Sequence, residues 1–237
     1  MIELDKIYNE DCLTTINNMS DNFIDLIVTS PPYNKKGFSN TKPSNQIWNK
    51  FNINYDVYND NMPIKEYEKW LISILNALER VLKPGGSIMF NHKPIRHNNQ
   101  AYLPYEFISK TNLKLYQLII WNRKNSPNIR KDILVPCTEH VYWLVKDKPK
   151  TFRDNLDREY LSEVWNIVAS RQKHHPSPFP EQIVKNCILL TTEVGDVVYD
   201  PFMGSGTSAL VAKKLGRNYI GSETSEEYCN IINKRLI

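Results

Sequence analysis

The chain has 237 residues, of which 41% are hydrophobic, and its formal net charge is +4 at pH 7. A chain of this length and composition can bury one substantial core, so it is predicted to fold and not to be disordered. No apolar run approaches the ~18 residues of a membrane-spanning helix, and the first residues lack the apolar core of a signal peptide. We therefore expect a cytoplasmic protein without a membrane segment.

The cysteines indicate neither a metal site nor a disulfide framework. Cys12, Cys137, Cys187 and Cys229 form no closely spaced pair of the kind that binds zinc or undergoes redox exchange. Scattered cysteines in a cytosolic chain are most simply buried free thiols.

Strands and helices are predicted to alternate along the chain. Residues 23–29 form a short apolar run rich in branched side chains, which predicts a buried strand ending at Pro31 and Pro32. Residues 34–62 are polar and show no clear period, which indicates a long, mobile loop. Beyond them the pattern predicts helices at 67–82, 180–190, 207–215 and 225–235, and strands starting at 87 and at 113–121, 140–145, 196–200 and 219–223. This alternation is typical of an α/β fold with a mostly parallel, doubly wound sheet.

A glycine-rich turn at 200–207, Asp-Pro-Phe-Met-Gly-Ser-Gly-Thr, lies between a predicted strand and a predicted helix. Glycines there let the backbone approach a ligand, and the helix N-terminus offers free N–H groups. The next strand ends at Glu223, where a carboxylate can accept both hydroxyls of a ribose. No Gly-Lys-Ser/Thr follows, so the balance favours a nucleoside cofactor without phosphates. An ordinary tight turn and a nicotinamide cofactor both stay open on spacing alone.

Two motifs together resemble a known family. The turn at 200–207 resembles the cofactor loop of the DNA amino-methyltransferases, and residues 29–33, Thr-Ser-Pro-Pro-Tyr, resemble their catalytic motif. The catalytic motif comes first and the cofactor loop last, as in the permuted (beta-class) members that modify cytosine N4 or adenine N6. RNA guanine methylases and protein methylases usually have the opposite order, so the order favours DNA. The resemblance covers roughly 5–121 and 174–237 and implies a Rossmann-like methyltransferase fold with circularly permuted motifs.

The resemblance also implies the cofactor, S-adenosyl-L-methionine. In the family, the position of Asp11 accepts a hydrogen bond from the adenine amino group and the backbone N–H of Cys12 meets the ring; a helix cap before Leu13 is the competing interpretation of Asp11. A proline-rich segment ending at Pro180 resembles the part that lines the methionine end. The complete set of predicted cofactor-binding residues is Asp11, Cys12, Pro180, Asp200, Pro201, Phe202, Gly204, Ser205, Gly206, Thr207 and Glu223.

The catalytic motif fits the chemistry of an amino group. An exocyclic amino nitrogen is a poor nucleophile because its lone pair is delocalised into the ring, and acceptors aimed at its two hydrogens can free that pair. By resemblance, the Ser30 hydroxyl and the Pro31 carbonyl are these acceptors, Pro32 helps to hold the carbonyl rigidly, and Tyr33 stacks on the target base. A proline turn that merely ends a strand is the alternative.

Ser30 favours cytosine N4 over adenine N6 as the target. The adenine-N6 enzymes of this class typically have aspartate at that position, whereas serine is similar to the cytosine-N4 enzymes. Pro136 and Cys137 mimic the nucleophile of cytosine-C5 enzymes, but there the cofactor loop precedes the Pro-Cys pair and here it follows. We therefore interpret Cys137 as structural. An adenine-N6 enzyme, a catalytically silent DNA-binding subunit and an RNA methyltransferase are the competing functions.

Residues 122–173 are predicted to be a target-recognition insertion in a discontinuous core of 1–121 and 174–237, with the 34–62 loop near the active site. Residues 121–175 contain 11 Lys and Arg against 7 Asp and Glu, which suits a polyanionic partner such as double-stranded DNA. The stretch 146–175 is polar and predicted to be irregular. A homodimer and a cognate restriction endonuclease are left open as partners. The candidate DNA-binding residues are Arg123, Lys124, Arg130, Lys131 and Arg153.

Overall fold

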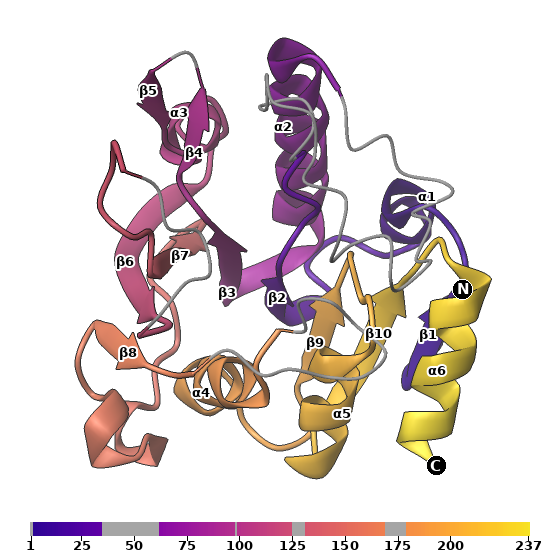
Figure 1. Ribbon diagram of the computed structural model, residues 1–237. Coiled ribbons are helices and arrows are strands. Elements are labelled where there is room, and N and C mark those ends of the chain that lie inside the picture. The colour runs from indigo at the N-terminus through magenta and orange to yellow at the C-terminus, as the bar shows by residue number, and fades with distance from the viewer. Residues whose placement is uncertain (1, 35–61, 98, 125–130, 169–178) are drawn as a thin grey trace.

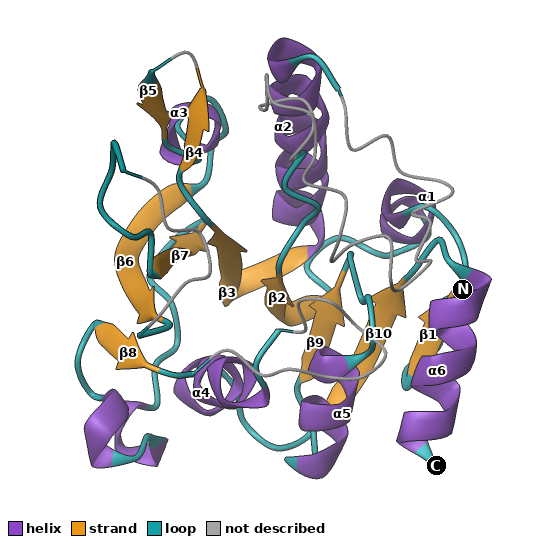
Figure 2. Ribbon diagram, viewed as in Figure 1, coloured by secondary structure: helices purple, strands orange, loops and turns teal. Residues whose placement is uncertain are grey.

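A computed structural model describes residues 2–34, 62–97, 99–124, 131–168 and 179–237 (Figure 1). Strands and helices alternate along most of these residues (Figure 2). The strands are β1 (Lys6–Tyr8), β2 (Ile24–Thr29), β3 (Leu82–His92), β4 (Ile95–His97), β5 (Gln100–Tyr102), β6 (Lys114–Asn122), β7 (Thr138–Val145), β8 (Val164–Asn166), β9 (Val197–Asp200) and β10 (Asn218–Ser222). The α-helices are α1 (Cys12–Asn17), α2 (Ile64–Val81), α3 (Tyr105–Ile108), α4 (Glu181–Thr191), α5 (Thr207–Lys214) and α6 (Glu226–Leu236), and two 3-10 turns are η2 (Arg153–Asn155) and η3 (Arg158–Tyr160).

One eight-stranded sheet organises the molecule. Its strand order is β1-β10-β9-β2-β3-β7-β6-β8, and β4 and β5 form a separate hairpin. The first five strands in this order, β1, β10, β9, β2 and β3, are mutually parallel. Strand β7 is antiparallel to both β3 and β6, and β8 is parallel to β6. The prediction of an α/β fold with a mostly parallel, doubly wound sheet is confirmed.

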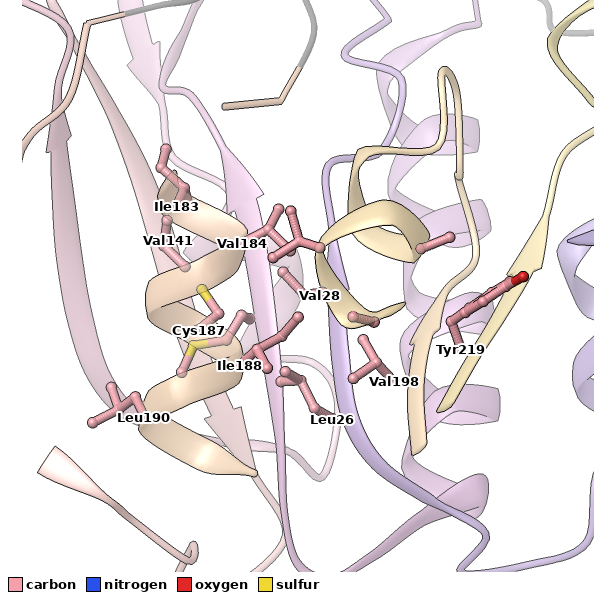
Figure 3. Close-up of a cluster of buried hydrophobic side chains, with 14 of the residues drawn as sticks. Leu26, Val28, Val141, Ile183, Val184, Cys187, Ile188, Leu190, Val198 and Tyr219 are labelled. Atoms are coloured by element: carbon pink, nitrogen blue, oxygen red, sulfur yellow. The ribbon is translucent and has the colours of Figure 1, made fainter. Parts of the chain in front are cut away.

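Helices cover both faces of the sheet, α1, α2 and α3 on one and α4, α5 and α6 on the other (Figure 1). Side chains along each central strand alternate between the two cores, as the period of a strand requires. On β2, Ile27 packs in the first core, and Leu26 and Val28 pack in the second. Figure 3 shows Val184 and Ile188 of α4 beside these last two residues. The sheet is thus buried on both sides, which explains why its strands are nearly continuous apolar runs.

The four long predicted helices correspond to α2, α4, α5 and α6, and the predicted strands to β2, β3, β6, β7, β9 and β10. Helix α2 begins three residues before the predicted start, at Ile64, whose side chain packs against the first core. The short elements β1, β4, β5, α3 and β8 were not predicted, because three or four residues give too little periodicity. The start of α1 was predicted only by the competing interpretation of Asp11 as a helix cap. Residues 146–175 were predicted to be irregular, and this was wrong at β8, which joins the sheet.

The range 122–173 contributes β7 and β8 to the main sheet, so within the described residues it is continuous with the catalytic core. Its role in target recognition stays a prediction. Of the predicted loop 34–62, residues 35–61 lie outside the described part of the chain. No helix among the described residues is long and apolar enough to cross a membrane.

Candidate active site

The two sequence motifs flank the point where the sheet reverses its winding. From β2 the chain crosses through α2 to β3, and from β9 it crosses through α5 to β10 on the other side and the other face. The adjacent strands β2 and β9 therefore form a topological switch point, and ligands of open α/β sheets bind at the carboxyl ends of such strands. Residues 30–33 follow β2 and residues 201–207 follow β9, so the fold brings both motifs to that point.

Asp200 organises the start of the cofactor loop. Its Oδ1 accepts hydrogen bonds from the Thr29 hydroxyl (2.7 Å) and the Phe202 N–H (3.0 Å), and its Oδ2 accepts one from the Ser208 hydroxyl (2.6 Å). Burial raises the pKa of the Asp200 carboxyl, and these hydrogen bonds oppose that rise. Both carboxylate oxygens accept from protein donors and the side chain is buried, so its expected effect on the cofactor is exerted through the shape of the loop.

Glu223 lies just beyond β10 and closes the loop from the other side. Its Oε2 accepts a hydrogen bond from the Gly204 N–H (2.8 Å), and its Oε1 accepts one from the Ser225 N–H (2.9 Å). Burial raises the pKa of this carboxyl, while the backbone hydrogen bonds lower it. The carboxylate is half-buried, and each oxygen has a lone pair left to accept a hydroxyl hydrogen. This geometry fits the predicted ribose contact.

Within the loop, only Phe202 and Gly204 are partly exposed, and the other residues from 200 to 207 are buried. Gly206 has φ of +83°, and a Cβ there would lie 2.8 Å from side-chain atoms of Ile232 on α6, so glycine is required for both reasons. The Thr207 hydroxyl is buried with no hydrogen-bond partner among the described residues. A glycine-shaped loop with a carboxylate and a free buried hydroxyl, but no lysine, suits S-adenosyl-L-methionine.

The remaining predicted cofactor residues lie at the neighbouring strand end or around α4. Asp11 follows β1, the neighbour of β10, and caps α1 by accepting a hydrogen bond from the Leu13 N–H (2.8 Å), as its competing interpretation predicted. Its second oxygen leaves the adenine contact open as a prediction. Cys12 begins α1 and is buried, which raises the pKa of its thiol to about 12. Pro180 is buried and precedes α4.

The catalytic motif is held by a network that the sequence did not reveal. The Ser30 hydroxyl lies 2.9 Å from the Tyr33 hydroxyl, which donates to Glu139 Oε2 (2.9 Å). Asn91 Nδ2 donates to the Tyr33 oxygen (2.7 Å) and to Glu139 (3.0 Å). Glu139 also forms an ion pair with Arg123 (3.1 Å). The only sequence signal for Asn91 was its place at the end of the strand next to β2; Glu139 had none.

A second set of contacts fixes the proline turn from the α2 side. The Tyr67 hydroxyl lies 2.7 Å from the Pro32 carbonyl, to which it can donate, and 2.8 Å from Nε2 of His92. His92 Nδ1 is 2.8 Å from the Lys93 carbonyl, and the His92 ring lies 4.5 Å from the Tyr33 ring between centroids. Complete burial lowers the pKa of His92 to about 3. A neutral His92 therefore supports both the turn and the tyrosine.

The candidate DNA-binding residues are separated by the structure into two kinds. Lys124, Lys131 and Arg153 are exposed, whereas Arg123 is 20% exposed and binds Glu139 and the Pro136 carbonyl. Arg130 lies outside the described residues. Contacts of all five with DNA stay predictions, and Arg123 has in addition a structural role as the ion-pair partner of Glu139.

Comparison with known proteins agrees with the geometry. The family model described as DNA methylase, of the N6 and N4 methyltransferases, matches residues 24–234. The type II methyltransferase M.BglII of Bacillus subtilis is 31% identical over 96% of this chain and 68% of its own length.

Solved structures give the same fold. The PvuII DNA methyltransferase, described as cytosine-N4-specific, has a TM-score of 0.79 at 23% identity, covering 98% of this chain and 86% of that one. TTHA0409 of Thermus thermophilus, solved with S-adenosyl-L-methionine, has a TM-score of 0.71 at 20% identity, covering 98% and 92%. Sequence, site geometry and these likenesses agree: the chain belongs to the family of DNA amino-methyltransferases, the N4- and N6-type DNA methylases that use S-adenosyl-L-methionine.

Proposed function

We propose that the chain methylates the N4 amino group of cytosine within a specific sequence of double-stranded DNA. The observation that carries this proposal is the Ser30 hydroxyl, which stands at the end of β2 across the switch point from the cofactor loop after β9. Serine at this position resembles the cytosine-N4 enzymes, whereas aspartate is typical of the adenine-N6 enzymes. Adenine N6 is the second candidate, because its amino group needs the same pair of acceptors.

The residues at the switch point suit amino-group chemistry. S-adenosyl-L-methionine supplies an electrophilic methyl group when it is bound. Ser30 Oγ and the Pro31 carbonyl accept from the two amino hydrogens, which localises the nitrogen lone pair for attack. The turn that carries both groups is held at Pro32 by Tyr67 and at Tyr33 by Asn91 and Glu139, so the acceptors are positioned before the base arrives.

The target base must leave the duplex to reach this site. The Tyr33 ring is half-buried at the end of the turn and is fixed by its hydroxyl, which leaves it as the proposed stacking partner of the base. The exposed cations Lys124, Lys131 and Arg153 support a role of residues 122–173 in binding the phosphates. A homodimer and a cognate restriction endonuclease stay predictions.

The test is methyl transfer from labelled S-adenosyl-L-methionine to mixed-sequence duplex DNA, followed by digestion to nucleosides and mass spectrometry. N4-methylcytosine is the expected product, and Ser30→Ala is the matched control, with turnover falling far more than cofactor affinity. N6-methyladenine would keep the enzyme class and show that Ser30 does not select the base. Methylation of structured RNA with none of DNA would overturn the proposed substrate.

A further inference from the structure

Glu139 is a buried carboxylate attached to the catalytic turn rather than to the cofactor loop. It lies at the start of β7, is 6% exposed, and accepts a hydrogen bond from the Tyr33 hydroxyl of the turn. Arg123 compensates its charge at 3.1 Å, and Asn91 donates to it at 3.0 Å. A carboxylate in such an ion pair accepts hydrogen bonds and donates none.

The acceptor character of Glu139 fixes the direction of the neighbouring hydrogen bonds. Tyr33 has a single hydroxyl proton, and donation to Glu139 uses it. Burial and the nearby Glu139 charge both raise the pKa of Tyr33, so the phenol keeps that proton at neutral pH. The Tyr33 oxygen must then accept from its other two neighbours, Asn91 and Ser30.

The orientation of Asn91 agrees with this direction. Its Nδ2 group lies within hydrogen-bond distance of both the Tyr33 oxygen and the Glu139 carboxylate, and an amide nitrogen can only donate. The opposite amide orientation would place Oδ1 against the carboxylate, which is repulsive. Asn91 is thus a fixed donor, and both the Tyr33 oxygen and the Glu139 carboxylate accept from it.

The consequence is a defined polarity at Ser30. Its hydroxyl proton is directed to Tyr33 at 2.9 Å, so its lone pairs are directed elsewhere. One of them faces Asn91 Nδ2 at a long 3.4 Å, which is a weak contact and leaves acceptor capacity for a substrate. In this arrangement Ser30 Oγ is an acceptor, which is the state that an amino hydrogen requires.

We propose that Glu139 is a positioning residue that, through the Tyr33 hydroxyl, sets Ser30 as a hydrogen-bond acceptor toward the amino group of the target base. This inference rests on the proposed function, methyl transfer to an exocyclic amino group. In this proposal Glu139 acts at a distance from the base, by fixing which way two hydroxyl protons point. The amide of Glu139→Gln can donate a hydrogen bond to the Tyr33 oxygen. The directions of the hydrogen bonds can then reverse, so that Tyr33 donates its proton to the Ser30 oxygen.

The kinetic test uses Glu139→Gln, Tyr33→Phe and the double variant with duplex DNA. We expect each single variant to lower kcat by about 10- to 100-fold, with the Kd for S-adenosyl-L-methionine changed less than about twofold. The double variant should lose no more than the worse single variant, because both act through one hydroxyl. A kcat of Glu139→Gln within about twofold of the unmodified protein, or independent and multiplying losses, would overturn the proposal.

Asp25→Asn is the matched control for burial. Asp25 is also 6% exposed and paired with a cation, Lys83 at 2.6 Å, but it lies near the opposite end of β2. Its loss should lower the melting temperature without changing kcat measured well below that temperature. Equal losses of kcat in Asp25→Asn and Glu139→Gln would show that Glu139 contributes only to folding.

A second measurement does not depend on methylation. The ¹³Cζ resonance of Tyr33, assigned with Tyr33→Phe, reports hydrogen-bond donation by its hydroxyl, and we expect it to shift in Glu139→Gln and not in Asp25→Asn. An unchanged resonance in Glu139→Gln would overturn the proposal that Glu139 sets the direction of these hydrogen bonds. If the unmodified protein methylates no DNA, the proposed function fails, and this resonance still decides whether Glu139 controls the hydroxyl of Tyr33.

Discussion

The hydroxyl of Thr29 donates a 2.7 Å hydrogen bond to the carboxylate of Asp200, across 171 positions of sequence. Both side chains are buried, and they are the last residues of the neighbouring parallel strands β2 and β9. The catalytic turn begins at the next residue after Thr29, and the cofactor loop begins at the next residue after Asp200. One hydrogen bond therefore joins the strand end that carries the catalytic turn to the strand end that carries the cofactor loop.

Replacing Asp200 by Ala should weaken cofactor binding and destabilise the fold together. The variant leaves the hydroxyls of Thr29 and Ser208 and the N–H of Phe202 without their acceptor, and unsatisfied buried donors cost about 1–3 kcal/mol each. Calorimetric titration and thermal unfolding measure the two effects. Thr29→Val removes one of these bonds and should show smaller losses of both affinity and stability. Unchanged cofactor affinity in Asp200→Ala would show that the loop shape held by Asp200 is not needed for cofactor binding.

Replacing Glu223 by Ala should lower affinity for S-adenosyl-L-methionine more than it lowers stability. The two donors that it leaves, the N–H groups of Gly204 and Ser225, lie in partly exposed backbone that water can reach. The proposed ribose hydrogen bonds to a charged acceptor contribute about 1.5–3 kcal/mol, a loss of roughly 10- to 100-fold in affinity. Titration calorimetry with Glu223→Ala measures it, and affinity within error of the unmodified protein would remove Glu223 from the cofactor site.

Replacing Gly206 by Ala should destabilise the protein by about 2–4 kcal/mol. The backbone at φ +83° disfavours any side chain, and the added methyl would meet Ile232 at 2.8 Å. Gly195→Ala is the matched control, since its φ is +90° but nothing lies within 4 Å of the added carbon. Denaturant unfolding of both variants separates strain from overpacking, and equal destabilisation would show that contact with α6 contributes nothing.

The stability of the protein should fall as the pH is lowered below about 6.5, in part because of His92. Burial holds its folded-state pKa at about 3, below the ordinary value near 6.5 of the unfolded chain. The unfolded chain therefore binds more protons between these values, so the contribution is fully present above pH 6.5 and is lost as pH falls toward 3.

The measurement is the free energy of unfolding at pH 7.5 and pH 5.5, for the unmodified protein and for His92→Gln. Glutamine does not titrate, and its amide can donate to the Tyr67 oxygen, whose own proton is directed to the Pro32 carbonyl. The unmodified protein should lose about 1 kcal/mol more than the variant over this interval. Parallel losses would mean that His92 is not held neutral in the folded protein.

Local sequence was enough to predict the main elements and the two motifs. The branched apolar runs at 23–29 and 196–200 had to be buried strands, and their abrupt ends at proline and glycine turns marked where a ligand can approach. These signals lie within about ten consecutive residues, so they are visible without a fold. The α/β class followed from them, while the resemblance of the motifs at 29–33 and 200–207 to a known family implied the family and the cofactor.

Tertiary structure decided what individual side chains do. Asp200 accepts three hydrogen bonds that hold the loop, Arg123 forms an ion pair, and Glu139 accepts from Tyr33 of the catalytic turn. Glu139 lies 106 positions from Tyr33, and Asn91 lies 58 positions from it. At such separations the strand order determines which polar side chains lie close together. Burial then makes it costly to leave any of them without a hydrogen-bond partner. The sequence thus determined which chemistry the chain carries, and the folded sheet determined which residues support it.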